Sequence, residues 1–552
     1  MELYDRLKEY TSSDFYPWHM PGHKRRLVEF ENPFSMDITE IDGFDDLHHP
    51  EGILKEAMEE AAEVYGSEKT YFLVNGSSCG ILAAVSAAVK PGGKLLMARN
   101  CHKSAYHGAL LQQAEVIYLY PELEKEGFYG AVQAKDVKSA LEKDPEICAV
   151  MVVSPGYEGI VSDIEAIAQA AHTCGCTLIV DEAHGAHFPF AGRYEFPVSA
   201  LEKGADIVIQ SLHKTRPSLT QTALLHLGKG SSAYVNPEAI EFYLRIYQSS
   251  SPSYILMASI DHCIHLMSGD KGKHLMAEYT RNLSAARSKL KEQLQRLQLY
   301  EPEQPLEPIP EQTPDQNAVR VEESKQRDWK KECFYDPSKF VIVVPENRLI
   351  RIQRKGESGK NFNTQIDGSY LAETLRYQYH LEPEMNTDRY VILMSSPADT
   401  KEGFSRMINA LLEIDQMLRN REIVYNEKRP GDRKQAQTSG EVKDRHTALW
   451  AKLPCKAPET IMKSAHASAA EGKWTPLSQS EGKVCHDFIY IYPPGIPLLV
   501  PGEQISKTEL EVIRTYQNHG LEVHGIKEEH NINIVIQKET FNKKKPICFP
   551  HI

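Results

Sequence analysis

The chain has 552 residues, 41% of them hydrophobic, so it can bury large cores and we expect about two to four domains. Its 63 lysines and arginines against 76 aspartates and glutamates give a net charge of −13, which argues against a broad nucleic-acid surface and favours cationic ligands. Charged residues occupy the start, where a signal peptide needs an apolar core, and no apolar run approaches the roughly 18 residues of a membrane span. These properties predict a cytoplasmic globular protein with no nucleic-acid or membrane partner.

The region from about 50 to 230 alternates helical and strand patterns. Apolar residues recur at helical spacing from Ile53 to Tyr65, and Gly66 stands where a helix would end. A second helical pattern begins at Ile164. Apolar strands separated by helices predict a largely parallel sheet covered on both faces. The predicted strands are 71–74, 94–98, 116–120, 148–153, 177–180, 207–210 and 222–227.

A run of small residues, 75–80, follows the first predicted strand and precedes a predicted helix, 81–90. Small residues let backbone amides approach a phosphate, and a helix N-terminus adds partial positive charge. The run is therefore either a phosphate-binding loop or an ordinary turn between a strand and a helix.

Ten cysteines in the whole chain are too few for a disulfide scaffold, and none form a Cys-x-x-Cys pair. Cys174 and Cys176 are the closest two, and we expect both to be buried, reduced thiols. We expect no metal site.

Two charged residues follow neighbouring predicted strands. Asp181 comes directly after 177–180, and Lys214 lies four residues after 207–210. In parallel sheets ligands bind beyond the carboxyl ends of the strands, where both side chains would project. Pyridoxal phosphate chemistry needs such a pair, because a lysine amine forms a Schiff base with the cofactor and an aspartate keeps its ring nitrogen protonated.

One alternative for this segment fails. Asp181-Glu182-Ala183-His184 spells the box of a helicase-type nucleotide hydrolase, but that function requires an upstream Gly-x-x-x-x-Gly-Lys-Ser/Thr loop, which the sequence lacks.

Beyond residue 265 the pattern is coarser. The proline-rich, acidic stretch 301–328 has no apolar period and predicts a solvated insertion. A second polar stretch, 426–444, precedes the C-terminal region. We predict an N-terminal segment at 1–50 packing on a large domain at 51–265, a small domain at 266–425 and a C-terminal domain at 426–552.

The chain resembles the bacterial ornithine/lysine/arginine decarboxylases of the aspartate-aminotransferase fold. The resemblance rests on motifs in the family's order, which are 21–24, 45–48 with Pro50 and Gly52, 75–79, 99–104, 181–185, 211–214, and 493–497 leading to 501–503. It implies a pyridoxal phosphate-dependent enzyme of fold type I, with a mainly parallel seven-stranded sheet in the large domain and α+β small and C-terminal domains. It also implies the short form, without the N-terminal wing domain of longer members.

The resemblance also implies roles for individual residues. Lys214 would be the Schiff-base lysine, Asp181 the partner of the ring nitrogen and His102 the stacking histidine. Ser250 would reach the phosphate of a neighbouring subunit, so the resemblance implies a homodimer or dimer-based oligomer. Further cofactor contacts would come from Ser77, Ser78, Cys79, His184, Ser211 and His213.

The implied reaction is loss of carbon dioxide from lysine, arginine or ornithine, giving cadaverine, agmatine or putrescine for polyamine metabolism. Lys214, or else His213, would return a proton to the α-carbon. Glu503 is the first candidate for the acid that meets the distal cation of the substrate, with Asp45 and Asp46 as alternatives. Other classes stay open: an aminotransferase or lyase of the same fold, or a non-catalytic homologue.

Overall fold

The computed structural model describes 3–26, 32–191, 196–302, 334–344, 366–420, 458–491, 495–518, 522–527 and 531–535, and the backbone alone at 351–355 and 361–365. The insertion predicted at 301–328 lies outside these ranges from residue 303 onward, and so does the polar stretch 426–444. Within the described ranges, no helix is both long and apolar enough to cross a membrane.

Seven strands form the largest sheet. They are β2 Lys69–Leu73, β3 Lys94–Ala98, β4 Glu115–Leu119, β5 Ile147–Val153, β6 Thr177–Asp181, β7 Ile207–Gln210 and β8 Ala223–Leu227. Their order is β2-β8-β7-β6-β5-β3-β4, and all are parallel except β8, which pairs antiparallel with β2 and β7. The predicted mainly parallel seven-stranded sheet is confirmed.

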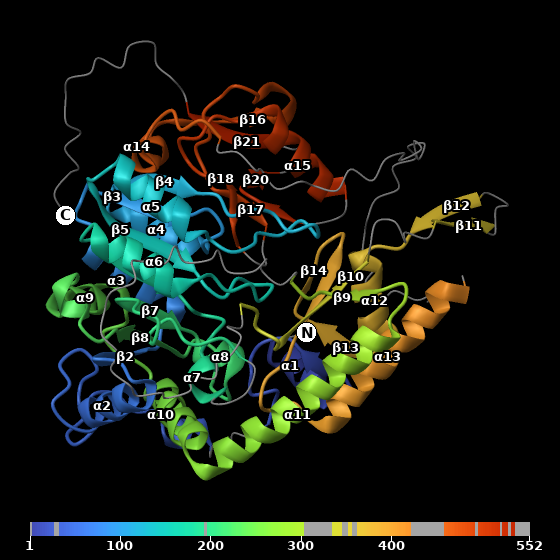
Figure 1. Ribbon diagram of the computed structural model, residues 1–552, viewed down its shortest axis with the longest axis horizontal. Coiled ribbons are helices and arrows are strands. Elements are labelled where there is room, and N and C mark those ends of the chain that lie inside the picture. Colours follow the sequence, from blue (N-terminus) through green and yellow to red (C-terminus); the bar gives the residue numbers. More distant parts are fainter. Residues whose placement is uncertain are drawn as a thin grey trace, which may run out of the picture.

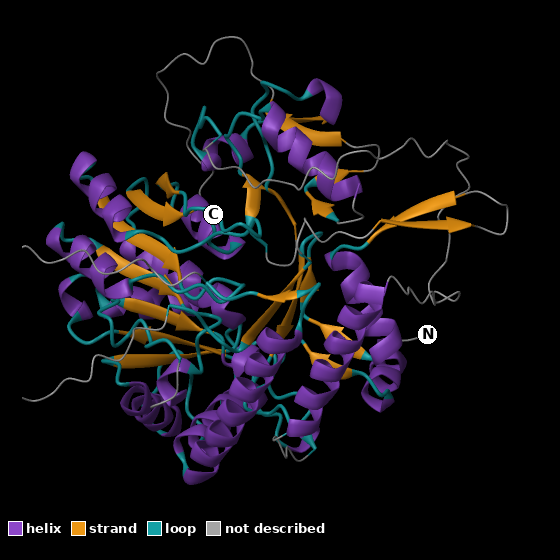
Figure 2. Cartoon of the chain, turned by 45° about the vertical axis from the view of Figure 1, so that its right-hand side comes forward, coloured by secondary structure: helices purple, strands orange, loops and turns teal. Residues whose placement is uncertain are grey.

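Helices lie on both sides of this sheet (Figure 2), which is why every residue of β6 and β7 is buried. Helix α3 packs against α4 and α9, while α5 packs against α6. The helices of this part are α2 Ile53–Tyr65, α3 Gly76–Ala88, α4 Lys103–Leu111, α5 Ala134–Lys143, α6 Ile164–Thr173, α7 Phe188–Ala191, α8 Leu212–Thr215, α9 Pro237–Tyr247 and α10 Tyr254–Ser268.

Some predictions for individual helices and cysteines agree with the structure and others differ from it. Helix α2 ends at Gly66 in the left-handed conformation, with φ 70°, as its position predicts. The helix expected from residue 81 instead begins at Gly76, so the small residues form its first turn. Cys176 is buried as expected, but Cys174 is exposed because it follows the last turn of α6.

A second part of the molecule packs around a four-stranded sheet (Figure 1). Its sheet order is β14-β15-β10-β9, and its core includes Phe340, Leu393 and Phe404. Its elements are α11 Asp270–Gln293, β9 Gln298–Leu299, β10 Lys339–Val343, β11 Arg351–Lys355, β12 Asn361–Gln365, α12 Gly368–Tyr379, β13 Leu381–Pro383, β14 Met385–Asn386, β15 Tyr390–Met394 and α13 Lys401–Asn420.

The N-terminal segment joins these two parts. It contains α1 Leu3–Ser12 and β1 Tyr16–Trp18, and β1 pairs in parallel with β13. The buried Lys24 donates its three ammonium hydrogens to the carbonyls of Pro17, His19 and Met394 at 2.8–3.0 Å, so its charge serves a fold contact. The backbone N–H of Gly22 donates to the carbonyl of His213 at 2.7 Å, next to Lys214.

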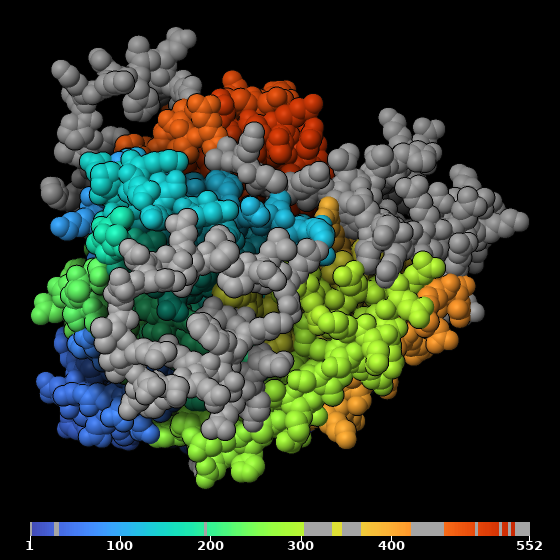
Figure 3. All heavy atoms as spheres, viewed as in Figure 1, coloured from blue at the N-terminus to red at the C-terminus, as the bar shows by residue number. Residues whose placement is uncertain are grey.

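The C-terminal part contains two three-stranded sheets, β16-β21-β20 and β18-β17-β19. Its surface meets that of the large sheet region in the space-filling view (Figure 3), and Lys103 at the start of α4 donates its N–H to the carbonyl of Gly495 at 3.1 Å. Its elements are α14 Ser464–Ala469, β16 Gly472–Pro476, β17 Ile489–Ile491, β18 Pro497–Leu499, α15 Lys507–Asn518, β19 Val523–His524, β20 Ile526–Lys527 and β21 Asn531–Val535.

Candidate active site

A cavity of about 810 Å³ opens where the three parts of the molecule meet. The large sheet contributes residues that follow β2, β3, β5 and β7 and the last residue of β6, so the cavity lies beyond the carboxyl ends of its parallel strands. The second part contributes residues around β13 and β14, and the C-terminal part contributes residues of β17 and β18. This is the place that the sequence predicts for a ligand.

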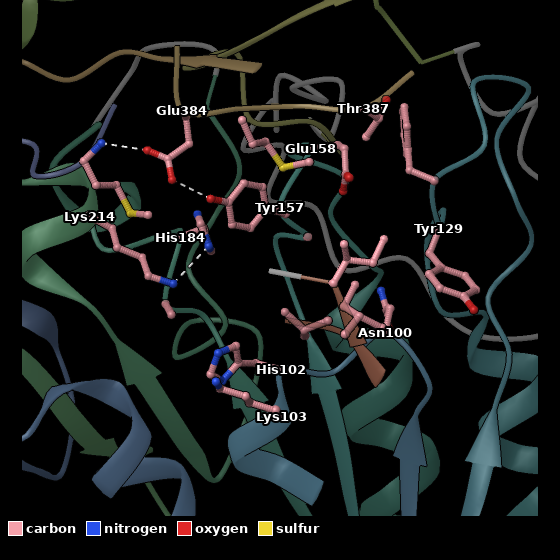
Figure 4. A pocket seen from close by; sticks show the side chains of 18 of the residues that line it. Asn100, His102, Lys103, Tyr129, Tyr157, Glu158, His184, Lys214, Glu384 and Thr387 are labelled. Carbon is pink, nitrogen blue, oxygen red and sulfur yellow. Dashed lines mark hydrogen bonds between the residues drawn. The ribbon is translucent and has the colours of Figure 1, made fainter. Parts of the chain in front are cut away.

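Lys214 reaches this cavity from α8, the short helix that follows β7. Its Nζ lies 3.0 Å from Nε2 of His184 (Figure 4). Burial lowers the pKa of Lys214, and the nearby carboxylate of Asp181 opposes that shift. A lowered pKa favours the neutral amine, which is the form that attacks an aldehyde.

Asp181 is the last residue of β6 and is 3% exposed. Its Oδ1 accepts the backbone N–H of Ala183 at 3.1 Å. Burial raises the pKa of Asp181, and the Lys214 ammonium opposes the rise. A buried carboxylate with so few partners is suited to a cationic ring nitrogen, which would supply the missing charge.

The first turn of α3 lies at one side of the cavity. Ser77 and Ser78 line the cavity together with Gly76, and the unpaired N–H groups of a helix N-terminus favour an anion there. The side chain of Cys79 turns away to donate to the carbonyl of Gly76 at 3.0 Å. The hydroxyl of Ser211 is buried without a hydrogen-bond partner among the described residues.

Three histidines complete this part of the site. His102 precedes α4 and its Nδ1 lies 2.8 Å from the Ser104 hydroxyl; burial, with the Lys214 charge as a second cause, lowers its pKa to about 3. Burial lowers the pKa of His213 to about 4, and its Nδ1 lies 2.8 Å from the carbonyl of Thr222. Burial also places the pKa of His184 well below its usual range. All three rings are therefore neutral at pH 7.

These groups fit pyridoxal 5'-phosphate. Lys214 could react with the aldehyde, Asp181 could pair with the ring nitrogen, and the first turn of α3 could bind the phosphate. The unpartnered Ser211 hydroxyl and His184 Nδ1 are buried polar atoms of the kind that a bound polar group satisfies. The structure therefore brings together the residues predicted to carry the chemistry, although their individual roles remain predictions.

The predicted substrate acids lie elsewhere. The Glu503 carboxylate is fully buried, receives a hydrogen bond from Arg99 at 3.1 Å and another from the Val500 N–H at 2.8 Å. It does not line the cavity, so the prediction that it faces the cleft is wrong for this chain: its charge is already paired.

Asp45 and Asp46 also have local partners. Asp45 accepts backbone N–H groups at the start of α2, including that of Gly52 at 2.8 Å, and Asp46 accepts the N–H of His48 at 2.8 Å. Neither lines the cavity of its own chain. Ser250 is exposed outside the cavity as well, and its predicted reach into a neighbouring subunit remains a prediction.

Three cavity residues were missed from the sequence. Tyr157 and Glu158 follow β5, and Glu384 lies between β13 and β14. The Tyr157 hydroxyl donates to Glu384 at 2.5 Å, and its ring lies 4.7 Å from that of His184 (Figure 4). The signal for Tyr157 and Glu158 was present, because they lie four and five residues after the predicted parallel strand 148–153. Glu384 carries no such signal.

A lysine and an aspartate at the ends of neighbouring parallel strands, beside a helix N-terminus, define a pyridoxal phosphate-dependent enzyme of fold type I. A family model described as "Orn/Lys/Arg decarboxylase, major domain" matches residues 2–403, and one described as "Orn/Lys/Arg decarboxylase, C-terminal domain" matches residues 447–533. The chain belongs to the Orn/Lys/Arg decarboxylase family and is a pyridoxal phosphate-dependent decarboxylase of basic amino acids.

Several relatives extend along nearly the whole chain. An arginine decarboxylase of Bacillus subtilis is 28% identical over 97% of this chain and 98% of its own length. The uncharacterized protein YaaO of the same organism is 32% identical over 92% of each chain. The solved structure of lysine decarboxylase A from Pseudomonas aeruginosa has the same fold, with a TM-score of 0.71 and 18% identity over 97% of this chain and 82% of that one.

Proposed function

We propose that this enzyme decarboxylates arginine to agmatine. The observation that carries the choice of substrate is similarity along the full length to a relative named arginine decarboxylase. A lysine decarboxylase of Pseudomonas aeruginosa is also similar, but at 24% identity and over 78% of its length. Lysine and ornithine are therefore the alternative substrates.

The residues of the cavity support decarboxylation by a simple division of roles. Bound pyridoxal phosphate supplies the electron sink that takes up the electron pair of the breaking bond between the α-carbon and the carboxylate. Asp181 keeps a proton at the ring nitrogen. His102 would help to hold the cofactor, and Nζ of Lys214 would deliver the proton that replaces the lost carboxylate at the α-carbon.

A rival reaction on this fold, transamination, keeps the substrate carboxylate and needs an arginine to hold it. The arginines among the described cavity residues each have a partner within this chain. Arg99 pairs with Glu503, Arg376 with Glu382, and Arg389 donates to the carbonyl of Lys125. This favours decarboxylation over transamination.

We also propose that the enzyme acts as a homodimer in the cytoplasm and supplies an amine for polyamine metabolism. One feature supports the dimer: large apolar side chains of the N-terminal segment are exposed in the single chain, with Phe34 at 88% and Ile41 at 49%. Large apolar side chains exposed in a single chain are often covered at an interface.

The direct test is release of carbon dioxide, measured separately with arginine, lysine and ornithine on the cofactor-loaded enzyme. We expect the largest kcat/KM with arginine. A larger value with lysine or ornithine would replace the proposed substrate, and no release from any of the three would refute decarboxylation of basic amino acids by this chain.

A further inference from the structure

We propose that Glu158 binds the distal cation of the substrate, a guanidinium or ammonium group. This inference rests on the proposed function and deepens it, because it names the residue that recognises a basic side chain. It replaces Glu503, Asp45 and Asp46, whose carboxylates have partners within this chain.

The first support is the state of the Glu158 carboxylate. Glu158 is only 8% exposed and lines the cavity. Its Oε1 accepts the Tyr390 hydroxyl at 2.8 Å, and among the described residues no cation lies within ion-pair distance of it. Burying a carboxylate with a single neutral partner is unfavourable in free energy unless a positive charge pairs with it. A basic substrate entering the cavity would bring that charge.

The second support is rigidity. Glu158 lies on a tight loop after β5, in which the Gly156 N–H donates to the carbonyl of Ile160 at 2.8 Å. Gly159 has a φ of +102°, and a Cβ there would lie 3.0 Å from Cγ of Lys339. The loop is further tied to the second part of the molecule by the Asp336 N–H, which donates to the Gly159 carbonyl at 2.8 Å. The carboxylate is thus held in place before a ligand arrives, which lowers the entropic cost of binding.

The third support is position. Figure 4 shows Tyr157 between Lys214 and Glu158, so the acid and the reactive lysine lie in one cavity on either side of that ring. A substrate whose α-amine is at Lys214 would extend its side chain past Tyr157 toward Glu158. The other acid beside Tyr157, Glu384, already accepts hydrogen bonds on both oxygens, from Tyr157 and from the Met20 N–H at 2.8 Å.

The test compares Glu158→Gln with the wild type, both loaded with cofactor. The substitution keeps the shape and a hydrogen-bond partner for Tyr390 but removes the charge. Since a charge-assisted hydrogen bond is lost, we expect KM for the preferred basic amino acid to rise roughly 10- to 100-fold, with kcat changed less than about 3-fold. The visible absorbance of the bound cofactor should be unchanged, which verifies folding.

Glu522→Gln is the matched control, because Glu522 is an exposed acid on the cavity lining. We expect its KM to stay within about 2-fold of the wild type. An equal rise in both variants would indicate general attraction by acidic surface and would overturn the assignment to Glu158.

Equilibrium binding separates this inference from the proposed reaction. Agmatine and 1,5-diaminopentane carry a distal cation, whereas 1-aminopentane does not. Measured by calorimetry, the Kd of agmatine and of 1,5-diaminopentane should be about 10- to 100-fold higher for Glu158→Gln than for the wild type, and the Kd of 1-aminopentane should be unchanged. If the variant binds the two cations more weakly but the wild type releases no carbon dioxide, the proposed decarboxylation is refuted and the cation site is retained. If the wild type releases carbon dioxide but KM and Kd are unchanged in Glu158→Gln, the cation site alone is refuted.

Discussion

At the scale of single residues, the site sets the protonation states that its chemistry needs. Burial lowers the pKa of the Lys214 amine, and the same cause keeps the surrounding imidazoles neutral at pH 7. Among the nearby acids, Asp181 favours the lysine ammonium most strongly, followed by Glu384. If Asp181 paired with the ring nitrogen of bound cofactor, it would stabilise the Lys214 ammonium less, which would further favour the neutral amine.

Replacement of Lys214 tests this arrangement. In Lys214→Ala the group that reacts with the aldehyde is missing, so the visible absorbance of the bound cofactor should be lost and carbon dioxide release should fall by roughly 10³-fold or more. The exposed Lys229, which follows β8, provides the control: Lys229→Ala should retain both. An unchanged spectrum in Lys214→Ala would contradict the cofactor assignment.

The pH dependence of KM tests Glu158. Burial raises the pKa of Glu158, and the hydrogen bond from Tyr390 opposes the rise. The charged form binds the cation, so binding is strongest above this raised pKa and weakens as pH falls through it. The facing hydroxyls of Tyr390 and Tyr335 have raised pKa values and stay neutral over that range. We expect KM of the wild type to rise on acidification and KM of Glu158→Gln to vary much less; parallel profiles would contradict the assignment.

At the scale of elements, the sequence predicts those helices and strands that are determined by residues close together in the chain. The strand expected at 207–210 matches β7 residue for residue, and 177–180 differs from β6 by Asp181 alone, because a buried parallel strand is apolar throughout. Lys214 and Asp181 were found because their place follows from these strands. The pairing of Glu503 with Arg99 could not be predicted, because the two residues are 404 positions apart and no local sequence pattern indicates such a contact.

That pair makes a prediction about the docking of the C-terminal part. Arg99 follows β3, is 2% exposed, and donates to Glu503 and to the Leu498 carbonyl. Glu503→Ala leaves a buried cation unpaired, which costs about 3–5 kcal/mol. We expect the thermal unfolding midpoint to fall by roughly 5–10 °C.

The control for this change is Glu511→Ala, which removes an acid whose side chain is 62% exposed and paired only with Lys507 one turn earlier. Its midpoint should stay within about 2 °C of the wild type. If Glu503→Ala raised KM while the midpoint did not move, Glu503 would be a substrate acid after all.

At the scale of the whole molecule, the loop after α9 bears on the proposed dimer. Gln248 is buried there, where its side chain accepts the Val74 N–H at 2.9 Å. The following residues, Ser249 and Ser250, are exposed, and the Ser249 N–H donates to Oδ1 of Asn75, at the start of the turn predicted to bind the phosphate, at 3.4 Å. The loop is thus anchored beside the predicted phosphate site of its own chain, and its tip is exposed where a second chain could contact it.

Mixed dimers decide whether Ser250 acts across that interface. Ser250→Asp places a negative charge where a phosphate is expected, so we expect this variant and Lys214→Ala each to be nearly inactive. If the Ser250 of one subunit serves the Lys214 of the other, co-refolding or co-expressing the two variants in equal amounts creates one intact site in each mixed dimer. Because about half of the dimers are then mixed and each has one of two sites, activity should recover to roughly a quarter of the wild type. Recovery is impossible if Ser250 serves the site of its own chain, since every site would then carry one of the two substitutions, and activity that stays at the level of the separate variants would refute the shared site.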